Sequence, residues 1–388
     1  MLNYSLSPEQ KLLKNSIREF CTKELSKDYV RWMDENVSYP PDELWKKIAD
    51  IGIFGLETPE KYDGIEMGPI ETVIVIEEIS KWSSGVALAV TTSLCFGSRP
   101  LIALGTEEQK MKYLPKLASG ELRWSMALTE PAGGTDILNA MSTTAVKDGD
   151  NFIINGQKMF ISGADEADYM TILALTDENA PKRSKAISIF IVDTKTPGIE
   201  IHKISKVCNH MCSVCEVFLD NVRVPKENIL GTLNNGWHEL LSTLNPERFY
   251  CAAMSLGLSE AIFKDSLQYA KEREAYGRPI GQFMALQHML ADMAVEIEVG
   301  RNLVYKCAWL CEQGKPYHVE ATMAKLFTAE KSCAHAMNGM EIFGGYGVCM
   351  EYDMQRYYRD VRQFPFAPIS NEMAKNYIGQ SLGLGRCF

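Results

Sequence analysis

One stretch of the chain combines hydroxyl side chains with consecutive glycines, a combination suited to an anionic or carbonyl-rich ligand. Within residues 126–136, Thr129 and Thr135 flank Gly133 and Gly134. A glycine has no Cβ, so backbone N–H groups can come close to a phosphate or carbonyl oxygen. Taken alone, such a stretch is most often an ordinary turn. Its significance therefore depends on what accompanies it.

A second stretch, residues 155–163, places an aromatic side chain two residues before a hydroxyl. It follows a strand-like run, and Asn155-Gly156 is typical of a tight turn, so the sequence predicts a hairpin that returns through Phe160 and Ser162. The aromatic ring could cover the face of a planar ligand, and the hydroxyl could bond its edge. The order and separation of the two stretches together predict the walls of a flavin site.

A third constellation contains a carboxylate. Asn245, Pro246 and Glu247 predict the start of a helix, with an asparagine cap, a proline at the first position and an acid in the first turn. On this pattern alone, Glu247 would complement the helix dipole at an exposed position.

Two further stretches could approach phosphates. Arg273 and Arg278 flank a helix-breaking turn at Tyr276-Gly277, which suits a pyrophosphate. Basic residues also end helices because they complement the dipole, so both interpretations stay open. Farther along, Gly344-Gly345 provides another backbone that a ligand could approach closely.

Composition excludes several classes of protein. The 388 residues carry a net charge of −10 with 46% hydrophobic residues, so we expect two or three globular domains, no nucleic-acid partner and no anionic membrane surface. We expect no apolar run of the ~20 residues that span a bilayer, and no targeting signal at the N-terminus. These features favour a cytoplasmic protein.

Eleven cysteines in such a chain indicate reduced thiols rather than disulfides. The segment from Cys208 to Cys215, with His210 and Cys212 between them, has spacings that could hold zinc or an iron–sulfur cluster. It lies between strand-like segments whose side chains alternate, which would scatter the sulfurs. We therefore expect no metal site.

The periodicity of the chain changes twice. Helical spacing of apolar residues covers residues 1–120, β-branched runs and turn clusters cover 121–235, and helical spacing returns over 236–388. The chain is thus predicted to be a multidomain α+β protein with a middle β-barrel or sandwich. An α–β–α order is not the interleaved pattern of a dinucleotide-binding sheet.

These motifs, in this order, resemble the acyl-CoA dehydrogenase family over nearly the whole chain. The resemblance rests on Thr-Glu-Pro-Ala-Gly-Gly-Thr-Asp, on Phe-Ile-Ser where Trp-Ile-Thr is more usual, on Arg-Glu-Ala-Tyr-Gly-Arg-Pro-Ile, on Phe-Gly-Gly-Tyr-Gly and on Arg359-Asp360. It implies a C-terminal four-helix bundle, a homotetramer with FAD between subunits, an acyl-CoA substrate and electron-transfer flavoprotein as electron partner.

The resemblance also implies two groups of cofactor contacts. The first group would line the flavin of its own subunit, and the second would reach the adenosine diphosphate half of a neighbour's FAD. The first group is Met126, Leu128, Thr129, Gly134, Thr135, Phe160, Ile161 and Ser162, and the second is Arg273, Tyr276, Phe283, Glu341, Gly344 and Gly345. Glu341 and Met284 replace usual glutamines, which predicts a lower FAD affinity.

The catalytic base departs from the commonest family pattern. Ala367 stands where most members carry a glutamate, whereas Glu247 beside Arg248 matches a minority resembling isovaleryl-CoA dehydrogenase. The resemblance therefore implies that Glu247 removes the α-proton, that Asn245 and Arg248 contact substrate, and that the Ala367 N–H binds the thioester carbonyl.

Three alternatives stay open on sequence alone. The chain also resembles the crotonobetainyl-CoA reductase branch, in which the saturated acyl-CoA is the product. An oxygen-using acyl-CoA oxidase or flavin monooxygenase would need no separate electron partner. A non-catalytic assembly protein on the same fold is disfavoured because Glu247 is present.

Overall fold

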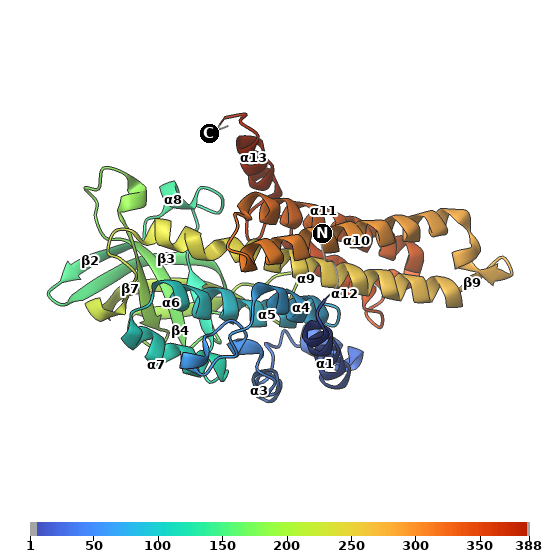
Figure 1. Ribbon diagram of the computed structural model, residues 1–388, viewed down its shortest axis with the longest axis horizontal. Coiled ribbons are helices and arrows are strands. Elements are labelled where there is room, and N and C mark those ends of the chain that lie inside the picture. The colour runs from blue at the N-terminus through green and yellow to red at the C-terminus, as the bar shows by residue number, and fades with distance from the viewer. Residues whose placement is uncertain (1–5, 386–388) are drawn as a thin grey trace.

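The computed structural model describes residues 6–385 and consists of helices, then strands, then helices. In Figure 1 the strands gather at one end of the longest axis, the long C-terminal helices run along that axis, and the N-terminal helices cover one side. The change from helix to strand falls between Ala118 and Trp124, and the return to helix falls between Leu230 and Gly236.

The N-terminal helices begin at caps that the sequence provides. Ser7 accepts a hydrogen bond from the backbone of Gln10 at 3.1 Å, and Thr106 accepts one from Gln109 at 3.2 Å, each within a capping box. The helices are α1 (Pro8–Glu24), α2 (Lys27–Glu35), α3 (Asp42–Asp50), α4 (Pro69–Ser80), α5 (Ser84–Ser93), α6 (Arg99–Leu104) and α7 (Glu107–Ala118), with a π-helical turn, η3 (Leu94–Ser98), between α5 and α6.

The most apolar helical stretch belongs to the core. Within residues 6–385, Ser84–Leu104 has the length and composition to cross a membrane, but 72% of its most apolar window is buried inside the structure. The expectation that no apolar run approaches ~20 residues is wrong for this stretch. The interior of a protein selects the same residue types as a bilayer.

The strands of the middle part, β1 to β8, form one eight-stranded sheet. Its hydrogen-bonded order is β6-β7-β3-β2-β4-β5-β8, and β1 pairs in parallel with β4. One face encloses an apolar cluster in which the rings of Phe152 and Phe190 lie 5.2 Å apart. The strands are β1 (Trp124–Ala127), β2 (Thr144–Asp148), β3 (Asn151–Ser162), β4 (Tyr169–Leu175), β5 (Ile187–Asp193), β6 (Ile199–Lys203), β7 (Val214–Pro225) and β8 (Ile229–Leu230).

The hairpin turn predicted at Asn155-Gly156 is wrong. Both residues lie inside β3, and the register with β7 shifts there as in a β-bulge. A Cβ on Gly156 would lie 2.4 Å from Oγ1 of Thr143, so the glycine permits a close approach of the preceding segment. The turn between β2 and β3 is instead made at Gly149, whose φ is 61°.

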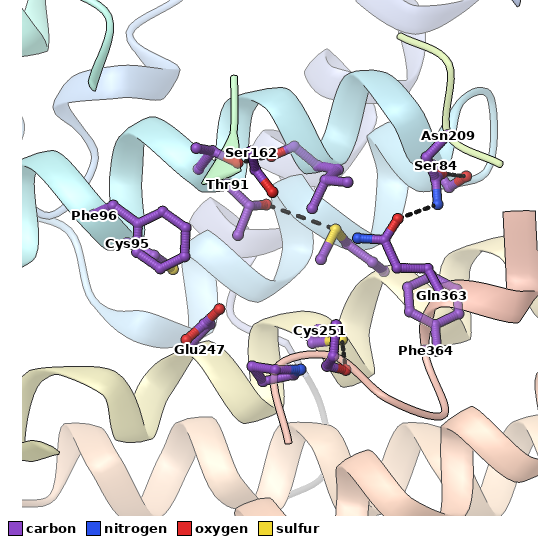
Figure 2. Close-up of a pocket in the computed structure, with 15 residues that line it drawn as sticks. Ser84, Thr91, Cys95, Phe96, Ser162, Asn209, Glu247, Cys251, Gln363 and Phe364 are labelled. Carbon is purple, nitrogen blue, oxygen red and sulfur yellow. Dashed lines mark hydrogen bonds between the residues drawn. The ribbon is translucent and has the colours of Figure 1, made fainter. Parts of the chain in front are cut away.

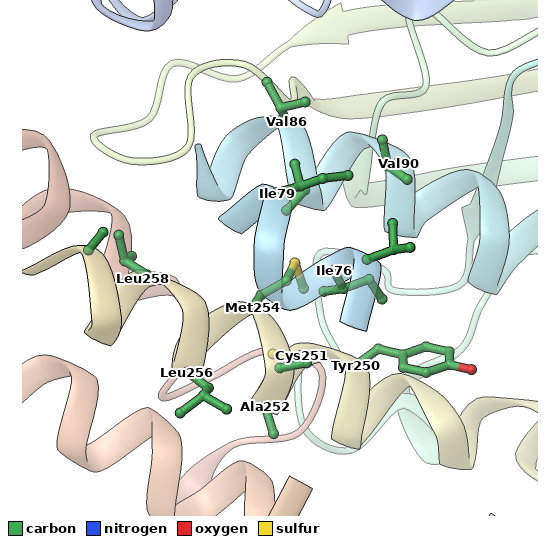
Figure 3. Packing of buried hydrophobic residues seen from close by; sticks show 14 of the residues in the cluster. Ile76, Ile79, Val86, Val90, Tyr250, Cys251, Ala252, Met254, Leu256 and Leu258 are labelled. Carbon is green, nitrogen blue, oxygen red and sulfur yellow. The ribbon is translucent and has the colours of Figure 1, made fainter. Parts of the chain in front are cut away.

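The C-terminal helices form a bundle that shares its core with the N-terminal part. Figure 3 shows Ile76 and Ile79 of α4 near Met254 of α9, with Val86 of α5 in the same apolar cluster. The elements after the sheet are α9 (Gly236–Glu272), the two-strand hairpin β9 (Glu274–Ala275) and β10 (Arg278–Pro279), α10 (Met284–Glu312), α11 (His318–Phe343), α12 (Met354–Asp360) and α13 (Asn371–Ser381).

The helix start predicted at Asn245 is also wrong. Helix α9 begins at Gly236, and Pro246 lies inside it. The earlier turns form because Trp237, Leu240 and Leu244 pack into an apolar cluster against the sheet. Pro246 leaves the carbonyl of Ser242 without its usual donor, which is tolerated because Ser242 is exposed to water.

A buried ion pair joins the two stretches that the sequence singled out. Lys158 of β3 lies 2.8 Å from Glu130 of the loop after β1, and both side chains are almost fully buried. Ser142 and Thr143 also donate backbone hydrogen bonds to the Glu130 carboxylate, at 2.6 and 3.1 Å. Burial opposes ionisation of Glu130, but the charge of Lys158 outweighs it and lowers the pKa of Glu130 to about 2.

Removing the cation should destabilise the fold. Lys158→Met would leave a buried carboxylate without its partner, a loss of about 3–5 kcal/mol in the free energy of unfolding. We expect the thermal unfolding midpoint to fall by several degrees, and the double variant Glu130→Gln/Lys158→Met to recover part of the loss. Arg223→Ala, which breaks an exposed ion pair with Asp148, is the matched control and should change stability by less than about 1 kcal/mol. Equal midpoints for Lys158→Met and this control would contradict the prediction.

Candidate active site

A partly open cavity of about 80 Å³ lies between helices α5 and α9, the end of β3 and the segment after α12. Figure 2 shows its walls: Thr91 and Cys95 come from α5 and η3, Ser162 from β3, and Glu247 and Cys251 from α9. The three parts of the chain thus contribute to one space.

Glu247 is the ionisable carboxylate of this cavity. Its side chain points toward the interior in Figure 2. Burial raises its pKa to about 7, and the charge of Arg248 only partly opposes that rise. A carboxylate with a pKa close to neutral pH is well matched to proton transfer. The dipole-complement interpretation fails because Glu247 lies in the interior of α9 rather than in its first turn.

Arg248 and Asn245 face away from this cavity. The guanidinium of Arg248 donates to Oγ1 of Thr322 at 3.0 Å and lies 5.3 Å from the ring of Tyr377. The side-chain amide of Asn245 donates to the carbonyl of Leu241 at 3.1 Å. Neither residue lines the cavity, so their contact with substrate stays a prediction.

Ala367 lines the cavity, as the sequence predicts for a residue near the reacting carbons. Its backbone N–H, however, already donates to the carbonyl of Gln363 at 3.1 Å. The surrounding segment is anchored by Lys325, a fully buried residue whose ammonium donates to the carbonyl of Pro365 at 3.3 Å and to Oδ1 of Asn371 at 2.9 Å. Binding of a thioester carbonyl by this N–H would need that local bond to give way.

The two predicted flavin walls lie side by side. The backbone N–H of Met159 donates to the carbonyl of Thr129 at 2.8 Å, and Oγ of Ser125 donates to the carbonyl of Ser162 at 2.7 Å. The segments that carry the first group of predicted contacts are thus joined at Thr129 and at Ser162. The group is Met126, Leu128, Thr129, Gly134, Thr135, Phe160, Ile161 and Ser162.

The local backbone at this place suits a planar cofactor. Phe160 has a positive φ of 61° beside a register shift in β3, and its ring is 62% exposed. A large aromatic residue rarely adopts that conformation without a reason. Among the described residues, no atom lies within 4 Å of the position that a Cβ would take on Gly134, so the loop backbone is accessible to a ligand.

The second group of predicted cofactor contacts lies far from the first. Arg273 follows α9, 26 residues after Glu247, which corresponds to about 40 Å along a helix. Figure 1 shows the hairpin around β9 at the end of the molecule opposite the sheet. The guanidinium of Arg273 lies 5.7 Å from the ring of Tyr346, and the rings of Tyr276 and Phe283 lie 6.2 Å apart. Glu341, Gly344 and Gly345 are exposed nearby, at the end of α11.

The side chains of the segment from Cys208 to Cys215 contact neighbouring protein groups. His210 pairs through its ring nitrogens with the carbonyls of Asp34 and Lys206, each at 2.9 Å. The thiol of Cys215 lies 3.2 Å from Oδ1 of Asp165, and Cys212 is fully buried. Among residues 6–385, no group of three or more His, Cys, Asp or Glu side chains is arranged to hold a metal ion.

Sequence reasoning missed several residues of the cavity. Ser84, Asn209 and Gln363 line it, although they lie more than 100 residues apart in the chain. None of them belongs to a motif with its own chemical signature. The π-helical turn that contains Cys95 and Phe96 could not be predicted from the sequence either, because its geometry arises from packing.

The comparisons with known proteins agree with this geometry. The chain matches the acyl-CoA dehydrogenase N-terminal domain over residues 7–121, the middle domain over 125–222 and the C-terminal domain over 234–383. It therefore belongs to the acyl-CoA dehydrogenase family, a family of flavoproteins. The predicted fold and enzyme class are confirmed.

Individual relatives cover the chain almost completely. It is 35% identical to a glutaryl-CoA dehydrogenase of Desulfococcus multivorans over 97% of each chain, and 35% identical to the caffeyl-CoA reductase-Etf complex subunit CarC of Acetobacterium woodii over 92% of this chain and 94% of the relative. The solved butyryl-CoA dehydrogenase of Megasphaera elsdenii is 32% identical, with a TM-score of 0.94 over 98% of this chain and all of that one.

The pKa of Glu247 predicts the pH dependence of proton removal. Burial raises that pKa to about 7, so the carboxylate that accepts a proton is depleted below pH 7 and predominates above it. Reduction of the flavin by an acyl-CoA should therefore slow about tenfold per pH unit below 7 and level off above 7. Stopped-flow absorbance under anaerobic conditions measures this rate. A rate that stays constant from pH 5.5 to 8 in the folded enzyme would contradict the assignment.

Proposed function

We propose that this enzyme transfers hydrogen at the α and β carbons of a short acyl-CoA thioester, with Glu247 as the acid–base residue. The single observation that carries this proposal is a half-buried carboxylate with a pKa of about 7. It faces a partly open cavity beside Ser162, at the end of the predicted flavin wall. An α-proton of a thioester is acidic enough to be removed by such a base.

The residues present fit FAD as the cofactor. The accessible backbone at Gly134, the exposed ring of Phe160 and the hydroxyl of Ser162 would hold the flavin end. When bound, FAD supplies the acceptor for the hydride from the β carbon. The protein's own task is to orient the acyl chain between this wall and Glu247, and to exclude water from the cavity.

Within this arrangement, Glu247 would remove the α-proton and become neutral. Its burial helps, because a neutral carboxyl is favoured in an apolar environment once it has taken up the proton. Developing negative charge on the thioester oxygen requires hydrogen-bond donors, and the N–H of Ala367, once it gives up its bond to the carbonyl of Gln363, is the candidate on this side of the cavity. Arg248 would orient the substrate after its guanidinium is released from Thr322, to which it donates at 3.0 Å.

The distant set of arginine and glycine residues supports a shared cofactor site. Arg273 cannot reach the flavin wall of its own chain, since about 40 Å of helix separates it from Glu247. At Gly344 and Gly345 the backbone is exposed, and no atom of the described residues lies within 4 Å of the place that a Cβ would take. We therefore propose a homotetramer in which these residues meet the adenosine diphosphate of a neighbouring subunit's FAD.

The reverse direction is a second candidate. The similarity to a caffeyl-CoA reductase-Etf complex subunit favours it. In that direction Glu247 would begin protonated and deliver its proton to the α carbon, and a pKa of about 7 serves either role at neutral pH. Electron-transfer flavoprotein would be the electron partner in both directions.

Replacing the base tests the proposal directly. Glu247→Gln keeps the size of the side chain but removes the proton acceptor, so flavin reduction by an acyl-CoA should slow by roughly 10²–10⁴-fold. Binding of FAD and of the thioester should persist, and the dependence on pH near 7 should disappear. Anaerobic stopped-flow absorbance and equilibrium binding measure these properties separately.

Near-normal flavin reduction in Glu247→Gln would remove Glu247 from the mechanism. A second variant, Glu247→Gln/Ala367→Glu, places a carboxylate at the position used by most of the family and lining the same cavity. We expect it to regain part of the lost rate. The control Cys333→Ala changes a residue of α11 outside the cavity and should retain the full rate.

The shared cofactor site predicts a linked loss of FAD and assembly. Arg273→Ala removes a cation at the proposed subunit boundary, so the tetramer should release FAD at least about tenfold more readily. Flavin fluorescence after dilution and light scattering measure the two effects. Lys226→Ala, which breaks an exposed pair with Asp150 on the sheet, is the control. Purification of wild type as a colourless monomer that takes up no FAD would overturn the shared site.

A further inference from the structure

The cavity has a polar end that the proposed reaction does not use. Ser84 donates to Oδ1 of Asn209 at 2.7 Å and lies 3.0 Å from Oδ2 of Asp360, and the side-chain amide of Asn209 donates to Oε1 of Gln363 at 2.9 Å. Figure 2 shows Ser84, Asn209 and Gln363 at the side of the cavity opposite Glu247. Ser84, Asn209 and Gln363 all line the space.

The network fixes the orientation of the Gln363 amide. The backbone N–H of Asn209 donates to Oδ1 of Asp360 at 2.6 Å, and its side-chain nitrogen also faces the carbonyl of Asp360 at 3.3 Å. An amide nitrogen donates to a carbonyl, and in the structure Asn209 presents its nitrogen on this side. Gln363 therefore turns its oxygen to Asn209 and its nitrogen to the cavity, as Figure 2 shows.

That nitrogen is a free donor within the cavity. Among residues 6–385, the hydrogen bond through Oε1 is the one that the Gln363 amide makes. The neighbouring hydroxyls are already used, because Thr91 donates to the carbonyl of Ala87 at 2.7 Å and Thr92 to that of Leu88 at 2.8 Å. Gln363 is half-buried, and an amide N–H that lines a cavity without a protein partner can donate to a ligand atom that accepts its hydrogen bond.

The charges around this end restrict the acceptor to a neutral group. Within the described part of the chain, no lysine or arginine lines the cavity. Glu247 is the one acid among the described lining residues, and the fully buried Asp360 lies behind Ser84, where Arg356 lies 3.9 Å from its carboxylate. A carboxylate at the end of the acyl chain would thus enter a cavity that has an acid but no cation in its lining, which is strongly unfavourable.

We propose that Gln363 selects acyl groups that carry a neutral hydrogen-bond acceptor, a carbonyl or hydroxyl oxygen, near the end distant from the thioester. This inference rests on the proposed function, because it assumes that the acyl chain enters the cavity past Glu247. It separates this enzyme from dehydrogenases of simple fatty acyl groups and of acyl groups that end in a carboxylate. Gln363 is a specificity residue here, and takes no part in proton transfer.

Binding of matched thioesters to the FAD-loaded enzyme tests the proposal. At two chain lengths, a ketone is compared with an isosteric hydrocarbon and a carboxylate: 4-oxopentanoyl-, 4-methylpentanoyl- and succinyl-CoA, and 5-oxohexanoyl-, 5-methylhexanoyl- and glutaryl-CoA. Isothermal titration calorimetry gives each Kd. At the length that fits, the ketone should bind about tenfold more tightly than the hydrocarbon, and the carboxylate should bind most weakly.

Two substitutions test whether Gln363 causes the preference for the ketone over the hydrocarbon. Gln363→Met keeps the length of the side chain but removes the donor, so the ketone preference should vanish. Gln363→Glu keeps the shape, lets Asn209 donate as before and presents an acid to the cavity, so the ketone should become the weaker ligand. Thr92→Val is the matched control, because that hydroxyl already donates to Leu88. It should leave the ratio of ketone to hydrocarbon unchanged.

The outcomes separate this inference from the proposed function. Equal Kd values for ketone and hydrocarbon at both lengths, a ketone preference that survives Gln363→Met, or tightest binding of a carboxylate would overturn it. If the ketone binds best but no thioester reduces the flavin, the inference stands and the proposed reaction fails. If thioesters reduce the flavin without regard to the distal oxygen, the proposed reaction stands and this inference fails.

Discussion

The arrangement of the site depends on one buried ion pair, between Glu130 and Lys158. Glu130 belongs to the loop after β1 and Lys158 to β3, so their contact at 2.8 Å fixes the two flavin walls relative to each other. Burial lowers the pKa of Lys158 to about 8, against the attraction of Glu130, and lysine still carries its charge at neutral pH. Such a pair is a costly way to gain stability. The pair instead fixes the position of the loop relative to β3, because each buried charge is stable only when its partner lies beside it.

Helix α9 imposes the second constraint. It carries Glu247 near one end, and Arg273 follows its other end, so one rigid element sets the distance between the acid–base residue and the predicted pyrophosphate contact. A distance of about 40 Å exceeds what one cofactor can span within a chain. The same helix is wedged against α4 and α5 through Met254 and its neighbours, which gives it little freedom to bend (Figure 3). The proposed assembly of subunits would bring both ends to one ligand.

The sequence was most informative where chemistry depends on short motifs. The glycine-rich loop, Phe160 and Ser162, and the acid at Glu247 could all be located because their residue types and spacing recur within a few positions. The errors came from reading local signals without their tertiary partners. Asn155-Gly156 has the composition of a turn, but the approach of Thr143 makes it a bulge inside β3. Pro246 has the composition of a helix start, but burial of Trp237 and Leu240 extends the helix in front of it.

The polar end of the cavity could not be predicted for a related reason. Ser84, Asn209 and Gln363 come together only through long-range packing. The carbonyl of Asp360 accepts a hydrogen bond from the Asn209 amide, and this orientation of Asn209 leaves the amide nitrogen of Gln363 without a partner among the described residues. None of these residues belongs to a sequence motif that would indicate a function.

With the proposed base on α9, the segment after α12 does not have to supply the carboxylate. Most of the family has its glutamate in that segment, which here carries Ala367 instead. The segment is held by the ammonium of Lys325 and by the thiol of Cys251, which lies 3.4 Å from the carbonyl of Ala367, so it is rigid without containing a charge of its own. A second carboxylate beside Glu247 would raise the pKa of both by repulsion. Its absence leaves burial as the main influence on Glu247, and leaves this wall of the cavity, from Gln363 to Pro368, free to recognise the acyl chain by neutral hydrogen bonding.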